Sequence, residues 1–215
     1  MASASSPGRL ERLLRSKVFA VALIVLPGIW PAWPILRQDP AVVADPSKYL
    51  LHHTGFVACI LLASVLSLAP LRVLFPHSRL VLALNRHRRL IGVSAFFYAL
   101  IHLGFQFIHE GGWPDFFHDI RKPFLLSGLI ALAILALLAA TSFNAAVRAL
   151  GGKRWKNLHR LAYLAAALAA YHQAAAHKLF PAQVLWIFVP LAALECARIA
   201  RSYHDRRLKE GSPAI

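Results

Sequence analysis

Two histidines, His102 and His172, stand inside long apolar stretches, where an ionisable side chain is costly enough to indicate a function. If their helices begin near Leu90 and Leu158, the two histidines lie about 12 and 14 residues in, or roughly 18 and 21 Å at 1.5 Å per residue. They therefore share a level in the membrane. Two imidazoles at one level on parallel helices are what bis-histidine ligation of a b-type haem needs.

A plainer interpretation is that both histidines only form hydrogen bonds between helices. The equal depth of the pair favours the haem, since cross-helix hydrogen bonds do not require it. The two cysteines, Cys59 and Cys196, stand alone in apolar stretches, and no CxxCH attachment motif or CxxC metal pair occurs in the chain.

His159 indicates a second candidate site at another depth in the membrane, because it lies near the start of the helix that carries His172. Trp155 and Tyr163 share its face at a spacing of four residues. His159 and His172 point about 140° apart on an ideal helix, so one haem cannot use both. A second haem at the His159 level would lack a partner ligand, because Arg89 stands where the other helix would have to supply it.

The cations around His159 favour a site for a phosphate-bearing or otherwise polar cofactor instead. Such a site would be built from Arg88, Arg89 and Arg154, joined by Arg86 and His159, since guanidinium groups bind phosphate with paired hydrogen bonds. The alternative is that these cations anchor the inner face of a membrane protein and that His159 lies at the interface.

Two further histidines, His52 and His53, begin an apolar stretch in the run LHHTG. We predict that they lie at the outer membrane interface, where either could donate a hydrogen bond to a quinone head group. The alternative is that both simply face water.

The elements that must position these side chains are membrane-spanning helices. The chain has 215 residues, of which 58% are hydrophobic and only 15% charged, and its mean hydropathy is +0.55. One water-facing domain cannot bury that much apolar surface. We predict an all-α bundle of six transmembrane helices, over residues 18–36, 49–69, 90–109, 123–143, 159–177 and 182–200.

The basic residues predict the orientation. Nineteen of the 24 Lys and Arg fall in the segments 9–17, 72–89, 148–160 and 198–209, which lie on one side if six spans alternate. That side is the cytoplasmic one, so both termini are expected there. This distribution explains the net charge of +15 without nucleic acid as a partner.

The expected organisation is therefore a cytoplasmic segment over residues 1–17, a transmembrane domain over 18–200 and a basic cytoplasmic tail over 201–215. A small transporter and a membrane scaffold without redox chemistry are the competing classes. A transporter would show broken helices with polar residues converging at the midplane, whereas the central stretches here lack acidic residues.

Two motifs, HRRLIG before the third apolar stretch and GKRWKNLHRLAY before the fifth, together resemble the MsrQ (YedZ) family of the ferric-reductase-like transmembrane superfamily. The resemblance covers about residues 10–205. It implies haem-linked roles for His102, His159 and His172 and matches Arg88 and Arg89 to the paired arginines of the family. His52 matches a family histidine of less certain role.

The resemblance also implies a function. Members of the family sit in the bacterial inner membrane and take electrons from the quinone pool or from a cytoplasmic flavin reductase. They pass them through b haem to a periplasmic molybdopterin-containing subunit that repairs methionine sulfoxide, and FMN is associated with them. The sequence holds no Gly-rich dinucleotide fingerprint, so we expect a redox subunit that depends on a separate electron donor and is not a complete reductase.

Overall fold

The computed structural model describes residues 8–110, 112–176 and 180–210, and within these ranges the chain is helical and contains no strand. The helices are α1 (Arg9–Arg15), α2 (Lys17–Ile29), α3 (Ala32–Leu36), α4 (Pro40–Val43), α5 (Pro46–Leu74), α6 (Arg79–Asn85), α7 (Arg88–His109), α8 (Trp113–Asp119), α9 (Pro123–Ala140), α10 (Asn144–Leu150), α11 (Gly152–His159), α12 (Leu161–Ala175) and α13 (Ala182–Glu210). The all-α fold class is confirmed.

Five segments of the described chain are long and apolar enough to cross a membrane. They are Lys17–Leu36, Pro46–Leu74, Arg88–His109, Pro123–Ala140 and Ala182–Leu208. The chain is thus a multi-pass membrane protein. The remaining predicted span, 159–177, coincides mainly with α12, whose 15 residues are fewer than those of the other five; residue 177 lies outside the described ranges.

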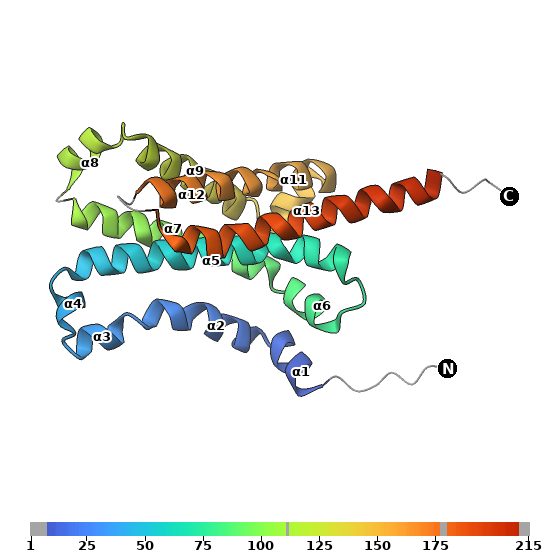
Figure 1. The fold of residues 1–215 in the computed structure, drawn as a ribbon, viewed down its shortest axis with the longest axis horizontal. Helices are drawn as coiled ribbons and strands as arrows, with labels where there is room; N and C mark the ends of the chain where they lie inside the picture. The colour runs from blue at the N-terminus through green and yellow to red at the C-terminus, as the bar shows by residue number, and fades with distance from the viewer. Residues whose placement is uncertain (1–7, 111, 177–179, 211–215) are drawn as a thin grey trace.

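Helix α5 is the centre of the bundle. It packs against α7 on one side and α13 on another, and it also contacts α12 and α2. Helix α9 packs against both α7 and α12, so α5, α7, α9 and α12 enclose a common interior. Figure 1 shows α1 and the C-terminal end of α13 at one end of the bundle and α8 at the other; we call these the termini end and the α8 end.

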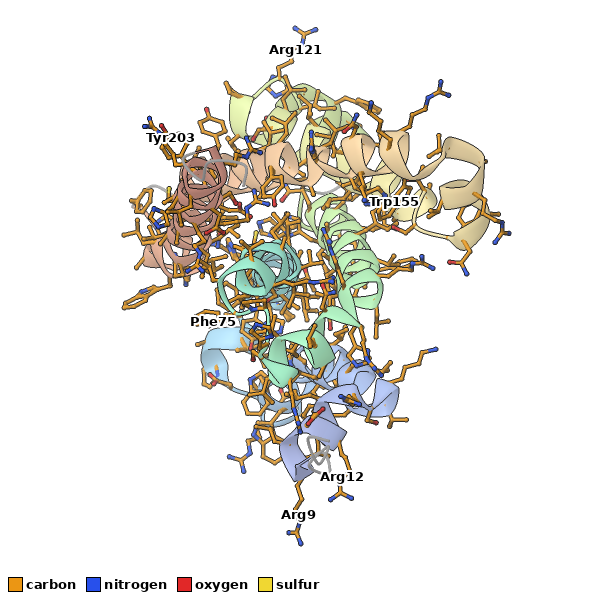
Figure 2. All side chains as sticks on the ribbon, turned by 90° about the vertical axis from the view of Figure 1, so that its right-hand side faces the viewer. Arg9, Arg12, Phe75, Arg121, Trp155 and Tyr203 are labelled. Atoms are coloured by element: carbon orange, nitrogen blue, oxygen red, sulfur yellow. The ribbon has the colours of Figure 1, made fainter. Side chains whose placement is uncertain are left out.

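Seen from the termini end, α5 lies in the middle of the molecule, and Arg9 and Arg12 of α1 project far from Trp155 of α11 (Figure 2). Small side chains let the central helices approach closely. Ala95 of α7 and Ala165 of α12 are both 0% exposed in a cluster that includes Leu62 of α5 and Leu135 of α9. The Ala-rich composition of α12 is therefore explained by close helix packing.

The entry to α5 is fixed by Asp45. Its carboxylate caps the helix by accepting the backbone N–H of Lys48, at 2.9 Å, and it also accepts the hydroxyl of Ser47. These two hydrogen bonds, the backbone bond first, lower the pKa of Asp45 below its usual value. His109 at the end of α7 lies 3.7 Å from the same carboxylate, so the α8 ends of α5 and α7 are linked at the edge of their membrane spans.

The prolines of the first span interrupt it. Helix α2 contains Pro27 and ends at Ile29, and α3 begins after Pro31. Pro31 has no N–H to donate to the carbonyl of Pro27 four residues earlier. The side chain of His53 supplies the missing donor, with its Nε2 at 2.6 Å from that oxygen. His53 thus ties α5 to the break in α2.

We predict that His53→Ala loosens the first span. The Pro27 carbonyl would lose its donor in an apolar setting, which costs about 1 kcal/mol and lowers the thermal unfolding midpoint in detergent by about 2–4 °C. The matched control is His77→Ala, since His77 is exposed. Equal midpoints for both variants would show that the hydrogen bond contributes nothing to stability.

Candidate functional site

The rings of His102 and His172 meet inside the bundle. His102 comes from α7 and His172 from α12, and their ring centres lie 5.9 Å apart with ring planes at 84°. A histidine nitrogen lies about 2 Å from the metal it binds and about 1.1 Å from the centre of its own ring. Two histidines that hold one metal from opposite sides would therefore have ring centres about 6 Å apart. The separation therefore fits a pair of axial ligands on one iron.

Both rings are held by the same kind of hydrogen bond. Nδ1 of His102 lies 2.8 Å from the carbonyl oxygen of Leu51 in α5, and Nδ1 of His172 lies 2.7 Å from the carbonyl oxygen of Phe124 in α9. A carbonyl only accepts, so each Nδ1 carries the proton and donates it. This tautomer leaves the lone pair of each Nε2 available to a metal, with the ring orientation already fixed.

A glycine makes room for each ring. A Cβ atom on Gly55 would lie 2.7 Å from Nδ1 of His102, and a Cβ on Gly128 would lie 2.7 Å from Nδ1 of His172. In both helices the glycine follows the accepting carbonyl by four residues. The residue at that position normally shields the carbonyl with its side chain, so glycine both opens the space and exposes the oxygen.

The two sides of the site also share a hydroxyl residue next to the glycine. Each glycine follows a buried hydroxyl residue, Thr54 in α5 and Ser127 in α9. Thr54 donates its hydroxyl to the carbonyls of Leu50 and Leu51, and Ser127 donates to that of Phe124 at 2.7 Å. The two sides of the site thus use one local sequence pattern, an accepting residue followed after three and four positions by a hydroxyl residue and a glycine.

Both rings line one cavity, which we call the outer cavity. Apart from His102 and His172, most of the lining is apolar or glycine, contributed by α5, α7, α9 and α12. Two imidazoles in an apolar slot are a donor set that fits haem. The described residues contain no group of three or more His, Cys, Asp or Glu side chains that could hold a bare metal ion.

A second cavity, the inner cavity, lies nearer the termini end. Leu62 and Leu135 line both cavities. The polar lining of the inner cavity consists of Asn85, Arg86, Arg88, Arg89, Ser142, Trp155 and His159. The sequence-predicted residues Arg88, Arg89, Trp155 and His159 are therefore brought together.

Thr141 fixes one wall of the inner cavity. The rings of Trp155 and His159 stack with centres 3.9 Å apart, and the indole N–H of Trp155 donates to the Thr141 carbonyl at 2.9 Å. The Thr141 hydroxyl lies 3.3 Å from Nε2 of His159. Arg89, which also lines this cavity, donates to the side chain of Asn144 at 2.7 Å. The wall offers one imidazole and no second histidine.

Two residues expected at this site lie elsewhere. Tyr163 donates to Glu195 of α13 at 2.9 Å, and Arg154 is exposed; neither lines the inner cavity. For Tyr163 the reason is a break in the helix, since α11 ends at His159 and α12 begins at Leu161, with three-residue hydrogen bonds on both sides of Arg160. Arg154 precedes this break and lies on another face of α11 than Trp155, the next residue. The sequence argument assumed one continuous helix, in which Trp155, His159 and Tyr163 would share a face.

The two neighbouring histidines of the run LHHTG have different surroundings. His52 lines the outer cavity, whereas His53 turns to the Pro27 carbonyl. Sequence reasoning also missed Gly55, Gly128 and the carbonyls that accept from the two rings. Their signal was the pair of Thr-Gly and Ser-Gly dipeptides, each inside an apolar stretch.

Known proteins resemble this chain over most of its length. The family model described as "Ferric reductase like transmembrane component" matches residues 54–170. A protein of Polaromonas naphthalenivorans named "Protein-methionine-sulfoxide reductase heme-binding subunit MsrQ" is 38% identical over 173 residues, which are 77% of this chain and 75% of that protein. A protein of the same name from Brucella ovis is 35% identical over 193 residues, covering 88% and 82% of the two chains. No solved structure gives a significant match.

We predict that Gly128→Ala and Gly55→Ala each displace a histidine ring. A Cβ at 2.7 Å from Nδ1 forces the ring from its carbonyl, and loss of this buried hydrogen bond costs about 1–3 kcal/mol. The thermal unfolding midpoint and the haem content of the purified protein should both fall. The control is Gly104→Ala in α7, where an added Cβ meets no atom within 4 Å. If all three variants behave alike, the glycines do not set the ring positions.

Proposed function

The chain belongs to the ferric-reductase-like transmembrane family and, within it, to the MsrQ haem-binding subunits, and from this premise we propose that it is a b-type haem electron-transfer subunit of a protein-methionine-sulfoxide reductase system. The observation that carries the proposal is the facing pair of His102 and His172 at 5.9 Å in an apolar cavity. Haem held there supplies a carrier that takes up and releases one electron at a time.

The protein's own residues account for holding such a group. His102 and His172 would hold the iron, and the carbonyls of Leu51 and Phe124 orient their rings. The apolar lining excludes water and favours a planar hydrophobic ring. Ring orientations fixed before the cofactor binds reduce the conformational entropy lost on binding.

We place the chain between an electron donor and a periplasmic electron acceptor. It accepts electrons from the quinone pool or from a cytoplasmic flavin reductase, and it passes them to a periplasmic molybdopterin-containing methionine sulfoxide reductase subunit. The names of the relatives support the link to methionine sulfoxide reduction. The position of His102 in α7, seven residues from its α8 end, supports electron delivery at that end.

We further propose six crossings of the bacterial inner membrane, with both termini in the cytoplasm. In this arrangement α12 forms the short fifth crossing and α11 lies at its entry. The 19 basic residues gathered in four segments support a cytoplasmic termini end. The position of α1 and the C-terminal part of α13 at that same end supports an even number of crossings.

The inner cavity is proposed to take FMN. Arg86, Arg88 and Arg89 line it, and guanidinium groups there could bind the phosphate while the stacked Trp155 and His159 offer an aromatic wall to a flat ring. A second haem in this cavity is less well supported, because the described lining contains one histidine. Arg154 and Tyr163 take no part in this proposal.

The experiment that tests the proposed function replaces the axial histidines. We expect His172→Ala and His102→Ala to remove the reduced b-type absorption bands of the purified protein, because one imidazole alone no longer holds the iron from both faces. His53→Ala, which alters a neighbouring histidine outside the cavity, should keep the bands. Undiminished bands in His172→Ala would refute the ligand assignment. A wild-type protein that stays colourless after haem supplementation would favour a scaffold.

The inner site is tested by its flavin content. We expect Arg88→Gln to reduce the FMN extracted per mole of chain at least about tenfold, because a hydrogen bond to a charged phosphate is lost, while the haem content is unchanged. Arg154→Gln removes an exposed arginine outside the cavity and should have no effect. Equal flavin in both variants, or none in the wild type, would contradict the assignment of this cavity to FMN.

A further inference from the structure

The polar side chains of the outer cavity are unevenly distributed. Besides the two axial histidines and Cys59, its lining has three residues with polar side chains, His52, Gln106 and Gln173. His52 precedes Gly55 by three residues in α5, which begins at the α8 end. Gln106 and Gln173 follow the histidines of α7 and α12, which both run toward that end. His52 and Gln106 therefore lie on the α8 side of the paired rings, and Gln173 lies beside His172, one residue nearer the α8 end.

The opposite side of the cavity is apolar. Toward the termini end its lining consists of side chains such as Leu62, Ala99, Ala131, Leu135 and Ala169. A ligand with one polar edge is consequently accepted in one orientation only. Burying a carboxyl group among these side chains would cost several kcal/mol without a hydrogen-bonding partner.

Gln173 has an unmet hydrogen-bonding requirement. Its side-chain oxygen is buried and has no hydrogen-bond partner among the described residues. A buried amide oxygen without a donor costs about 1–3 kcal/mol. Gln106 differs, because its amide donates to Glu110 at 2.6 Å. Gln173 is therefore the residue of this group whose side-chain oxygen needs a hydrogen bond from a ligand.

We infer that Gln173 binds the carboxyl edge of the haem and orients the porphyrin with that edge toward the α8 end. Haem carries its two carboxyl groups on one edge, and a protonated carboxyl donates to the amide oxygen of Gln173. An ionised one accepts from the amide NH₂ after rotation of the side chain, since an amide supplies both kinds of partner. This inference rests on the proposed haem site and adds the direction in which the cofactor is inserted.

The test combines a near-isosteric substitution with a modified cofactor. Wild type, Gln173→Met and the control Gln183→Met, an exposed position of α13, are each loaded with natural haem or with haem dimethyl ester, whose carboxyl groups are blocked. The rate of haem transfer to excess apomyoglobin is then followed by absorbance. The reduction potential is recorded for every pair as a second readout.

We expect Gln173→Met to accelerate the loss of natural haem about tenfold and to change the loss of the dimethyl ester by less than about twofold. Gln183→Met should match the wild type with both cofactors. Equal acceleration with both cofactors would mean that Gln173 only fills space, and no acceleration with either would mean that it makes no contact; both results overturn the inference. If wild type instead takes up neither cofactor with a six-coordinate low-spin spectrum, the proposed function itself fails.

Discussion

The hydrogen bonds from His102 and His172 to the carbonyls of Leu51 and Phe124 are the interactions on which the rest of the site depends. A helix inside a membrane already pairs its carbonyls with its own N–H groups, so a side chain from another helix can reach one only where the backbone is uncovered. Gly55 and Gly128 uncover it. The close packing of α5 on α7 and of α9 on α12 follows from the need to bring each ring against bare backbone.

Histidines outside the site satisfy backbone groups in the same way. His53 donates to the Pro27 carbonyl, and Nε2 of His87 lies 3.0 Å from the carbonyl of Leu14 in the last turn of α1. In the first case a proline has removed the ordinary donor, and in the second the acceptor stands at a helix end. A histidine in a membrane span is therefore not by itself a metal ligand. The pair at His102 and His172 is distinguished by rings that face each other across a cavity.

Much of the fold could be predicted from the sequence, because length and apolar composition determine membrane spans. The pairing of His102 with His172 also followed from depth alone, since rise per residue is nearly constant along a helix. The rotation of side chains around a helix was less predictable. One turn at Arg160 separated Tyr163 from His159, and no local composition marked it. The neighbours His52 and His53 point to different helices, which depends on the position of α2 and not on their own sequence.

The repeated pattern of carbonyl, hydroxyl residue and glycine has a consequence for the origin of the bundle. Helices α5 and α9 both begin at the α8 end, and α7 and α12 both run back toward it. In the pair of α5 and α7 and in the pair of α9 and α12, the first helix supplies the carbonyl and the glycine, the second supplies the histidine, and the helix directions are the same. This is the arrangement of a parallel internal repeat with its axis along the membrane normal. A dimer of one two-helix hairpin would meet the same stereochemical requirements. Duplication of a gene for such a hairpin, followed by fusion of the copies, is therefore sufficient to explain the four-helix core.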